Sequence, residues 1–168
     1  MNEEGSSLRP NSATALRVAG LLLMAAVAGG LANLAHPRKI AWVEDWSRYI
    51  EARALAAGFR LADTATTREI VENRSHLIFD ARPAMDFKAG HLPGAVSLPY
   101  DAVQNEFQNV AVLLLGGQPI LTYCSGLVCD ESFLLTEFLR QQGTTNIVLY
   151  SGGYEEWTRA GLPVEGRP

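Results

Sequence analysis

The chain has few of the residues that build disulfide frameworks or metal sites. Only two of its 168 residues are cysteines, Cys124 and Cys129. Two cysteines exclude the multi-disulfide scaffold of small secreted proteins. One C-x4-C pair is also a poor zinc site, because tetrahedral zinc needs four ligands and the histidines His36, His76 and His91 are scattered. We therefore expect no metal or cofactor, and interpret the cysteines as reactive rather than structural.

The chain also lacks a basic excess. Its 14 Lys and Arg against 18 Asp and Glu give a net charge of −4, so no nucleic-acid partner is expected. Charged residues are only 19% of the chain and hydrophobic residues 48%. This composition supports a packed core and excludes a largely disordered chain. The length suits one domain with an appendage.

An uncharged apolar segment follows a polar N-terminal tail at residues 1–17. This segment, residues 18–35, is at the short end of the roughly 17–25 residues that span a bilayer, and it predicts one transmembrane helix. A cleaved secretory signal is an alternative, because Ala26-Val27-Ala28 before Gly29 resembles a cleavage site. A buried helix of a soluble protein is the third interpretation.

The residues after the apolar segment favour a membrane-proximal connector over residues 36–58, containing a helix at 45–57. Aromatic rings at helical spacing are typical of the headgroup layer, although they would also pack on a soluble domain; they are Trp42, Trp46 and Tyr49. Lys and Arg are more frequent after the segment than before it. We expect a single-pass cell-membrane protein whose domain lies on the cytoplasmic side.

Residues 59–168 alternate between strand and helix patterns, which predicts an α/β domain. Short apolar runs predict strands at 59–62, 76–80, 95–98, 119–124 and 146–150. Capped or amphipathic segments predict helices at 64–73, with Asp63 as N-cap, and at 102–115, 130–142 and 154–160. This alternation is typical of a mainly parallel sheet covered by helices on both faces.

Cys124 directly follows one of the predicted core strands, and a predicted helix begins near Asp130. Ligand sites of open α/β sheets lie beyond the carboxyl ends of the strands. The loop amides could surround a thiolate or persulfide, and Gly126 would permit a positive φ. With the helix N-terminus, they would lower the Cys124 pKa from its usual value of about 8.5. The candidate substrate-binding loop is Ser125, Gly126, Leu127 and Val128.

Three motifs in order resemble the rhodanese family over about residues 59–165. Residues 77–99, LIFDARPAMDFKAGHLPGAVSLP, resemble its Asp-x-Arg and Gly-His-Leu-Pro-Gly-Ala signature, and residues 151–157, SGGYEEW, its C-terminal Gly-Gly-x3-Trp. Cys124 falls at the family's sulfur-carrying cysteine. The resemblance implies a five-stranded parallel sheet and sulfurtransferase activity through a Cys124 persulfide. It implies mainly scaffold roles for four residues, with Arg82 expected to pair with Asp86. The four are Asp80, Arg82, Asp86 and His91.

The cysteine loop departs from the family pattern. Rhodaneses often carry a basic residue there that attracts thiosulfate, whereas CSGLVC has none and is followed by Asp130 and Glu131. These carboxylates suit a helix N-terminus and repel small dianions. We therefore expect the donor to be a protein or low-molecular-weight persulfide, or polysulfide, rather than thiosulfate. The acceptor would be a thiol or a persulfide carrier.

Cys129 leaves several functions open. It is a small buried hydrophobe, a resolving thiol that closes a disulfide with Cys124, or a second acceptor of sulfur. The chain as a whole is accordingly a sulfurtransferase, a non-catalytic rhodanese-like binding or regulatory module, or a thiol–disulfide redox sensor built on both cysteines.

Overall fold

The computed structural model describes residues 11–36 and 48–166. The chain divides into two compact units, Met1–Glu44 and Asp45–Pro168. Trp42 and Trp46, which the sequence suggests for a membrane interface, lie outside the described residues.

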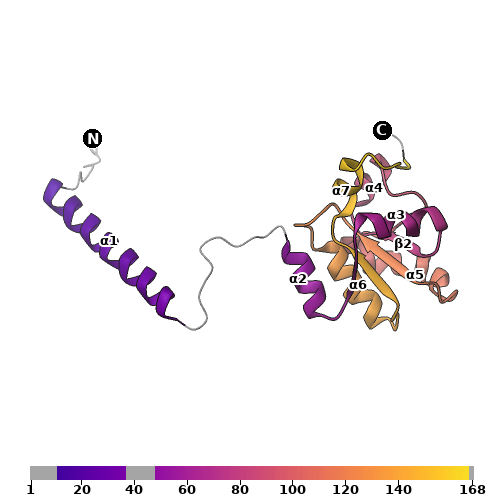
Figure 1. Ribbon diagram of the computed structural model, residues 1–168, viewed down its shortest axis with the longest axis horizontal. Helices are drawn as coiled ribbons and strands as arrows, with labels where there is room; N and C mark the ends of the chain where they lie inside the picture. Colours follow the sequence, from indigo (N-terminus) through magenta and orange to yellow (C-terminus); the bar gives the residue numbers. More distant parts are fainter. Residues whose placement is uncertain (1–10, 37–47, 167–168) are drawn as a thin grey trace, which may run out of the picture. The chain divides into compact units, whose positions relative to one another are not determined.

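The first unit contains one long helix, α1 (Ser12–Ala35), drawn in indigo in Figure 1. Asn11 caps it by accepting a hydrogen bond from the amide of Ala13 at 2.9 Å. The helix therefore begins inside the predicted polar tail. Its 24 residues span about 36 Å at 1.5 Å per residue, and its mean hydropathy reaches 2.0. By length and composition the helix could cross a membrane, and N-terminal signal sequences share this property.

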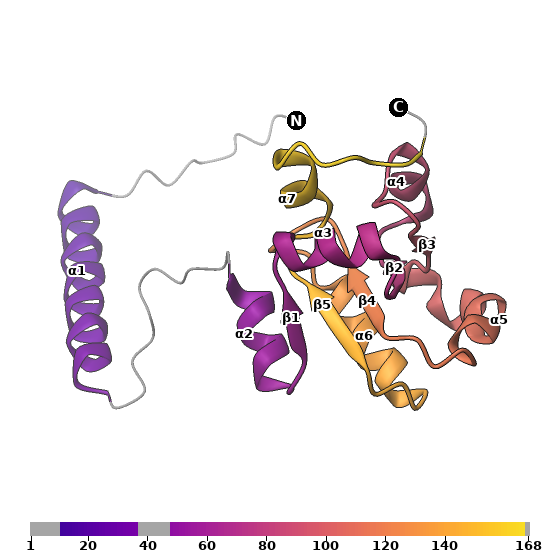
Figure 2. The same ribbon diagram turned by 45° about the vertical axis from the view of Figure 1, so that its right-hand side comes forward.

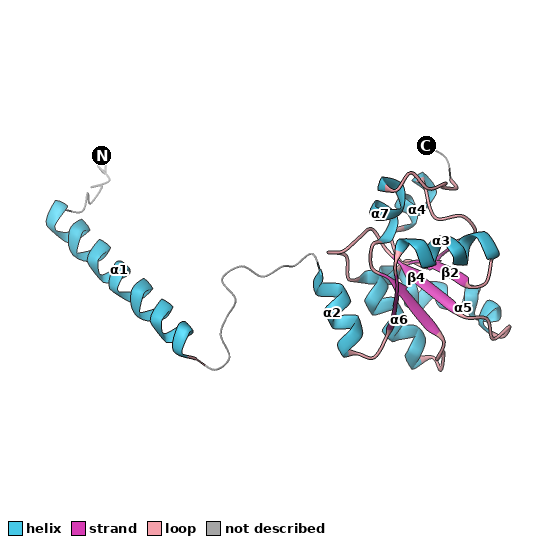
Figure 3. Cartoon of the chain, in the orientation of Figure 1, coloured by secondary structure: helices cyan, strands magenta, loops and turns pink. Residues whose placement is uncertain are grey.

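The second unit is built on a five-stranded sheet in the order β1-β5-β4-β2-β3, with every pair parallel. Figures 2 and 3 show the strands at the centre of the helices. The predicted parallel sheet is thus confirmed. The strands are β1 (Arg60–Ala62), β2 (Leu77–Asp80), β3 (Val96–Ser97), β4 (Ile120–Tyr123) and β5 (Ile147–Tyr150).

Helices cover both faces of the sheet, because successive strand residues point to opposite sides. Ile120 packs with α5 and α6, whereas its neighbour Leu121 packs on the opposite face with residues of α3 and α7. The helices of this unit are α2 (Tyr49–Ala56), α3 (Thr64–Asn73), α4 (Ala84–Ala89), α5 (Val103–Leu114), α6 (Glu131–Gln141) and α7 (Gly153–Arg159), and a 3-10 turn, η2 (Tyr100–Ala102), precedes α5.

Helix α2, which the sequence places in a connector, is part of the domain core. Ile50 and Ala54 are 1% and 0% exposed and pack in one cluster with Phe133 of α6 and Leu149 of β5. The guanidinium of Arg53 lies 4.1 Å from the centre of the Phe133 ring. The compact unit therefore begins before the predicted domain start at residue 59.

Helix α3 and its cap agree with the sequence prediction in full, since the side chain of Asp63 accepts from the amide of Thr66 at 2.8 Å. Helix α4 was not predicted. It has only six residues and none of them is buried, so no apolar period marks it in the sequence.

Candidate functional site

Cys124 occupies the carboxyl edge of the sheet, directly after the central strand β4. In the strand register, the last residue of β4, Tyr123, is opposite the last residues of β2 and β5, Asp80 and Tyr150. Three strand ends therefore lie side by side, and the chain leaves β4 for the loop at this edge. This is the location where open parallel sheets place their ligand sites.

The two cysteines are joined by a disulfide bond across the loop. Their Cα atoms are 6.3 Å apart, within the usual range of about 4.4–6.8 Å. The loop backbone thus allows the bond that sequence spacing alone leaves open. In this structure Cys129 is not the inert buried thiol that was one interpretation of the sequence.

The surroundings of Cys124 differ from the predicted ring of amide donors. Cys124 is 1% exposed and packs in an apolar cluster with residues of β2 and α6. Its Sγ lies 3.0 Å from the carbonyl oxygen of Cys129 and 3.9 Å from that of Gly126. Within residues 48–166, no backbone N–H donates to this sulfur.

The loop turn explains this arrangement. The amide of Cys129 donates to the carbonyl of Gly126 at 3.0 Å, so this loop amide is not free to donate to the sulfur. Carbonyl oxygens rather than amides face Sγ of Cys124. A disulfide sulfur also carries no negative charge that would attract donors. Gly126 does not adopt the expected positive φ. The lowered pKa of Cys124 stays a prediction, because a disulfide has no thiol to titrate.

The base of the loop is fixed by the N-terminus of α7. The amides of Tyr154 and Glu155 donate to the carbonyls of Cys124 and Ser125, each at 2.8 Å. Gly153 makes this close approach possible: its φ is +60°, and a Cβ atom there would lie 2.4 Å from the carbonyl oxygen of Cys124. The second glycine of the C-terminal motif is therefore a packing requirement of the cysteine loop.

Carboxylates surround the mouth of this loop. Glu131 contacts Sγ of Cys129, and Glu155 lies against the backbone of Gly126. A shallow cavity of about 180 Å³ between the loop and α7 is lined by Leu127, Val128, Gly152, Glu155, Glu156 and Arg159. Two cations lie beside these carboxylates: Arg53 of α2 is 3.6 Å from the carboxylate of Asp130, and Arg159 of α7 lines the cavity.

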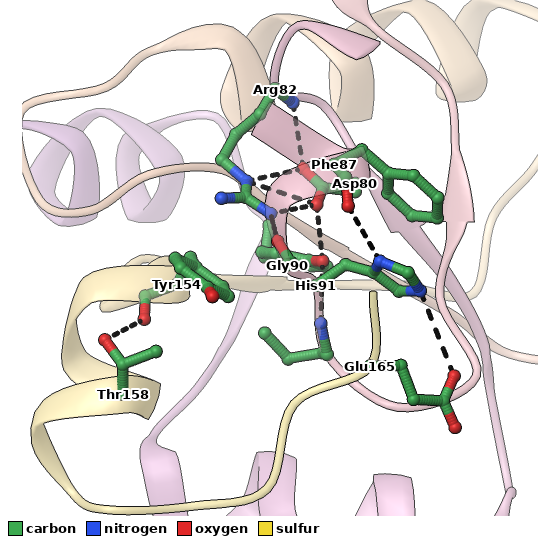
Figure 4. Close-up of polar contacts among 10 residues, drawn as sticks. Asp80, Arg82, Phe87, Gly90, His91, Tyr154, Thr158 and Glu165 are labelled. Carbon is green, nitrogen blue, oxygen red and sulfur yellow. Dashed lines mark hydrogen bonds and ion pairs between the residues drawn. The ribbon is translucent and has the colours of Figure 1, made fainter. Parts of the chain in front are cut away.

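Asp80 and Arg82 form a buried ion pair, 0% and 4% exposed, beside the strand ends. The Nε and Nη2 atoms of Arg82 bond the carboxylate of Asp80 at 3.0 and 2.6 Å, and Nη2 also donates to the carbonyl of Gly90 at 2.6 Å (Figure 4). The guanidinium lies 4.1 Å from the centre of the Tyr154 ring. Burial alone would lower the Arg82 pKa, but the bonds and charge of Asp80 outweigh it and raise the pKa.

The predicted pairing of Arg82 with Asp86 is therefore wrong. Asp86 is exposed on α4, so water solvates its carboxylate. The carboxylate of Asp80 is fully buried and needs a counter-charge. Residues two apart in an extended chain point to the same side, so the sequence contained a signal for the Asp80–Arg82 pair.

Tyr123 extends this network to β4, and the sequence analysis missed it. Its hydroxyl donates to Asp80 at 2.5 Å and accepts from the amide of Leu92 at 3.1 Å. Burial raises the pKa of Tyr123, and the neighbouring Asp80 raises it further, so the phenol stays neutral. The network thereby holds the residue that precedes Cys124. Its position at the end of a core strand was the available sequence signal.

His91 lies apart from the cysteines and joins α4 to the C-terminal segment. Its Nδ1 is 2.8 Å from the carbonyl oxygen of Phe87, and its ring stacks on that of Phe87 at 3.8 Å (Figure 4). Its backbone pairs with Glu165 in both directions, at 2.8 and 2.9 Å. These contacts position the Gly-His-Leu-Pro segment and bring no titratable group to the cysteine loop.

Cys124, Cys129 and Glu131 offer donor atoms that all lie within 4.8 Å of one another. A metal-bound cysteine must be a thiolate, so the disulfide form cannot use its sulfurs in this way. The three donors are also fewer than the four of a structural zinc site. Sulfur chemistry therefore describes this cluster better than metal binding.

Comparisons with known proteins agree with this geometry. The model of the rhodanese-like domain family matches residues 63–160, more than half of the chain. The chain is 31% identical over 110 residues to the HTH-type transcriptional regulator Rv0324 of Mycobacterium tuberculosis, covering 63% of this chain and 46% of that protein. It is 29% identical over 97 residues to the thiosulfate sulfurtransferase GlpE of Actinobacillus succinogenes, covering 58% and 82%.

Among solved structures, the BH2092 protein of Bacillus halodurans superimposes with a TM-score of 0.58 at 24% identity, over 69% of this chain and 83% of that one. The thiosulfate sulfurtransferase of Pseudomonas aeruginosa gives 0.56 at 20% identity, over 73% and 23%. These two likenesses concern the fold alone. With the family model covering β2 to β5, the cysteine loop and α7, the chain belongs to the rhodanese-like domain family.

Proposed function

We propose that the chain is a membrane-anchored sulfurtransferase that carries sulfane sulfur as a persulfide on Cys124. The observation that carries the proposal is the position of Cys124 at the end of the central strand, with a second sulfur atom bonded to it at the half-buried loop mouth. The outer sulfur of a Cys124 persulfide needs a position of this kind, bonded to Cys124 and close to the loop mouth. The curated relatives of the family include sulfurtransferases.

The reaction begins from the reduced loop. The Cys124 thiolate attacks the outer sulfur of a donor persulfide, the donor's sulfur–sulfur bond breaks, and the donor leaves as a thiolate. An acceptor thiolate then attacks the outer sulfur on Cys124 and restores the Cys124 thiolate. Each step forms one bond to sulfur and breaks one, so the complete transfer needs no oxidant or reductant.

The charges at the loop mouth favour a persulfide donor over thiosulfate. No Lys or Arg lies in the loop. The carboxylates at or beside it, Asp130, Glu131, Glu155 and Glu156, outnumber the neighbouring cations Arg53 and Arg159. A dianion such as thiosulfate is repelled by each carboxylate about twice as strongly as a monoanionic persulfide at the same distance. A low-molecular-weight persulfide, or a protein persulfide whose surface carries basic residues, fits this mouth better.

The anchor in this proposal is α1, with the domain on the cytoplasmic side. Full-length chain should remain in the membrane pellet after an alkaline wash and should have the mass of the uncleaved sequence. A soluble chain that has lost residues 1–28 would instead identify the segment as a secretory signal.

The test of sulfur transfer uses full-length chain in detergent with Cys129→Ser, so that any persulfide stays on Cys124. After reduction and removal of the reductant, the protein receives one equivalent of a small persulfide, of polysulfide or of thiosulfate. We expect intact mass to rise by one sulfur atom with the first two donors, and peptide mapping to locate it on Cys124. No gain with any donor, or the same gain after Cys124→Ser, would refute the proposal.

A thiol–disulfide redox sensor is the second candidate, and the Cys124–Cys129 disulfide favours it. Under mild oxidant without sulfur donor, a sensor loses both thiols together. A non-catalytic regulatory module is the third, motivated by the absence of basic residues from the loop. In that case Cys124→Ser would preserve the biological role.

A further inference from the structure

We propose that Cys129 is a built-in resolving thiol that converts the sulfur carried by Cys124 into hydrosulfide, with Glu131 as its proton acceptor. The inference rests on the proposed persulfide at Cys124. In this step the Cys129 sulfur attacks Sγ of Cys124, the inner sulfur of the persulfide. The disulfide seen in the structure forms, and the outer sulfur leaves.

The loop is already built for this attack. The Cα atoms of the two cysteines are 6.3 Å apart, and the loop between them contains a turn closed by the hydrogen bond from the Cys129 amide to the Gly126 carbonyl. A short loop with its own hydrogen bond keeps the attacking sulfur at a high effective concentration. The pair therefore needs no second protein to bring the thiols together.

Burial selects an internal thiol as the one that reaches the inner sulfur. Cys124 is 1% exposed in this structure, and Cys129 lies on the same loop, so Cys129 reaches Sγ more readily than a bulky external thiol. Cys129 is only half-buried, and the adjacent Val128 is 78% exposed. An external reductant therefore meets Cys129 first, forms a mixed disulfide there and frees Cys124.

Glu131 supplies the proton acceptor. Its carboxylate contacts Sγ of Cys129, and Glu131 is fixed as the first residue of α6. The neighbouring carboxylate, Asp130, is instead 3.6 Å from Arg53. Attack by a thiol requires loss of its proton, and a carboxylate at contact distance can accept it as the sulfur–sulfur bond forms.

The step is balanced in atoms, charge and electrons. A Cys124 persulfide anion and a Cys129 thiol give one disulfide and one hydrosulfide ion, with the proton passing from Cys129 through Glu131 to the departing sulfur. The two cysteine sulfurs are oxidised and the outer sulfur is reduced, so no external oxidant takes part. A dithiol reductant resets the disulfide, and the overall reaction turns sulfane sulfur and a dithiol into sulfide and a disulfide.

The experiment follows one turnover of reduced full-length chain in detergent, without oxygen or free thiol, after one equivalent of a small persulfide. Intact mass is read together with released sulfide. The wild-type chain should lose the mass of two hydrogens and release one sulfide per chain. The Cys129→Ser chain should keep one extra sulfur and release none. A sample without donor should keep both thiols, which excludes oxidation by residual oxygen.

Glu131→Gln tests the proton acceptor. We expect disulfide closure to slow by at least about tenfold near neutral pH. The deficit should shrink as pH rises through the ionisation of the Cys129 thiol, because a thiolate needs no acceptor. The matched control on the same helix, Glu137→Gln, should close at the wild-type rate. Equal rates for Glu131→Gln and wild type would remove Glu131 from the mechanism.

Two outcomes separate this inference from the proposed function. If wild-type chain keeps the extra sulfur on Cys124, or passes it to Cys129 without releasing sulfide, the resolving role is wrong and the sulfurtransferase proposal survives. If Cys129→Ser gains no sulfur from any donor, the persulfide itself is absent and both proposals fall.

Discussion

The carboxyl edge of the sheet contains two polar clusters that are built in opposite ways. In the network of Asp80, Arg82 and Tyr123, every member is buried and its charge or hydroxyl is bonded to another member or to the backbone. In the Cys124–Cys129 loop, the sulfurs face carbonyls and a half-exposed carboxylate. The first cluster is suited to hold strand ends, and the second to change its bonds.

Two neighbouring residues of the chain belong to these different clusters. Tyr123 is locked by Asp80, and the next residue, Cys124, carries the reactive sulfur. A fully bonded buried network resists rearrangement because breaking any member leaves an unpaired polar group. The loop beyond it, held at its base by the α7 amides, can therefore change its sulfur bonding without disturbing the sheet.

The largest effect is expected from removing the charge that balances the scaffold. Arg82→Ala leaves the carboxylate of Asp80 buried without its partner and should lower the free energy of unfolding by about 3–5 kcal/mol. Urea unfolding of the chain in detergent measures it. The exposed pair of Arg68 and Glu72 is the control, and Arg68→Ala should cost less than about 1 kcal/mol. Equal losses would contradict the distinction between the clusters.

A smaller loss of stability is expected where scaffold and loop meet. Gly153→Ala places a methyl group 2.4 Å from the Cys124 carbonyl at a φ of +60°, so it should cost about 2–3 kcal/mol through strain and displacement of the loop. Gly143→Ala, at a φ of +92° with open space around it, should cost only about 1 kcal/mol. Sulfur loading of Cys124 should also slow in the first variant. A Gly153→Ala chain as stable and as active as wild type would exclude this packing role.

Reversing one charge at the loop mouth should change donor preference. Glu155→Lys replaces a carboxylate next to Gly126 by a cation and should raise the rate of loading from thiosulfate by about tenfold. Loading from an uncharged organic polysulfide should stay the same. Glu69→Lys, exposed on α3, is the control and should leave both rates unchanged. An unchanged thiosulfate rate in Glu155→Lys would mean that the carboxylates do not select the donor.

The smallest effect concerns alkaline stability. Burial raises the pKa of Tyr150 from 10.0 to about 12, although its bond to Thr64 lowers it. The folded state therefore prefers the neutral phenol, and its contribution is complete below pH 10 and is lost as pH rises from about 10 to about 12. Tyr150→Phe should flatten this part of the curve of unfolding free energy against pH. An identical slope in both chains would show that Tyr150 does not titrate differently on folding.

The sequence predicts the sheet and most helices because their signals are local. Apolar runs mark the strands, and the cap Asp63 with an amphipathic period marks α3. Helix α4 was not predicted because it has six residues, none of them buried, and so shows no apolar period. Helix α2 is misplaced in a connector because the burial of Ile50 and Ala54 depends on partners about 80 to 100 positions later, Phe133 and Leu149.

The candidate site is predictable only in part for a similar reason. The position of Cys124 follows from a strand that ends at it, so motif and pattern agree. The disulfide, the carbonyls that face Sγ and the contact between Cys129 and Glu131 depend on the path of a loop, which no periodicity encodes. The approach of Arg53 and Glu155 to that loop is set by the packing of α2 and α7.

Persulfide formation on Cys124 is tested by the intact mass of reduced Cys129→Ser chain after one equivalent of a small persulfide, with the added mass mapped to a residue. We expect one additional sulfur atom on Cys124, removable by an external thiol and absent after Cys124→Ser. An unchanged mass under the same conditions, with the chain folded and its Cys124 thiol free, would contradict it.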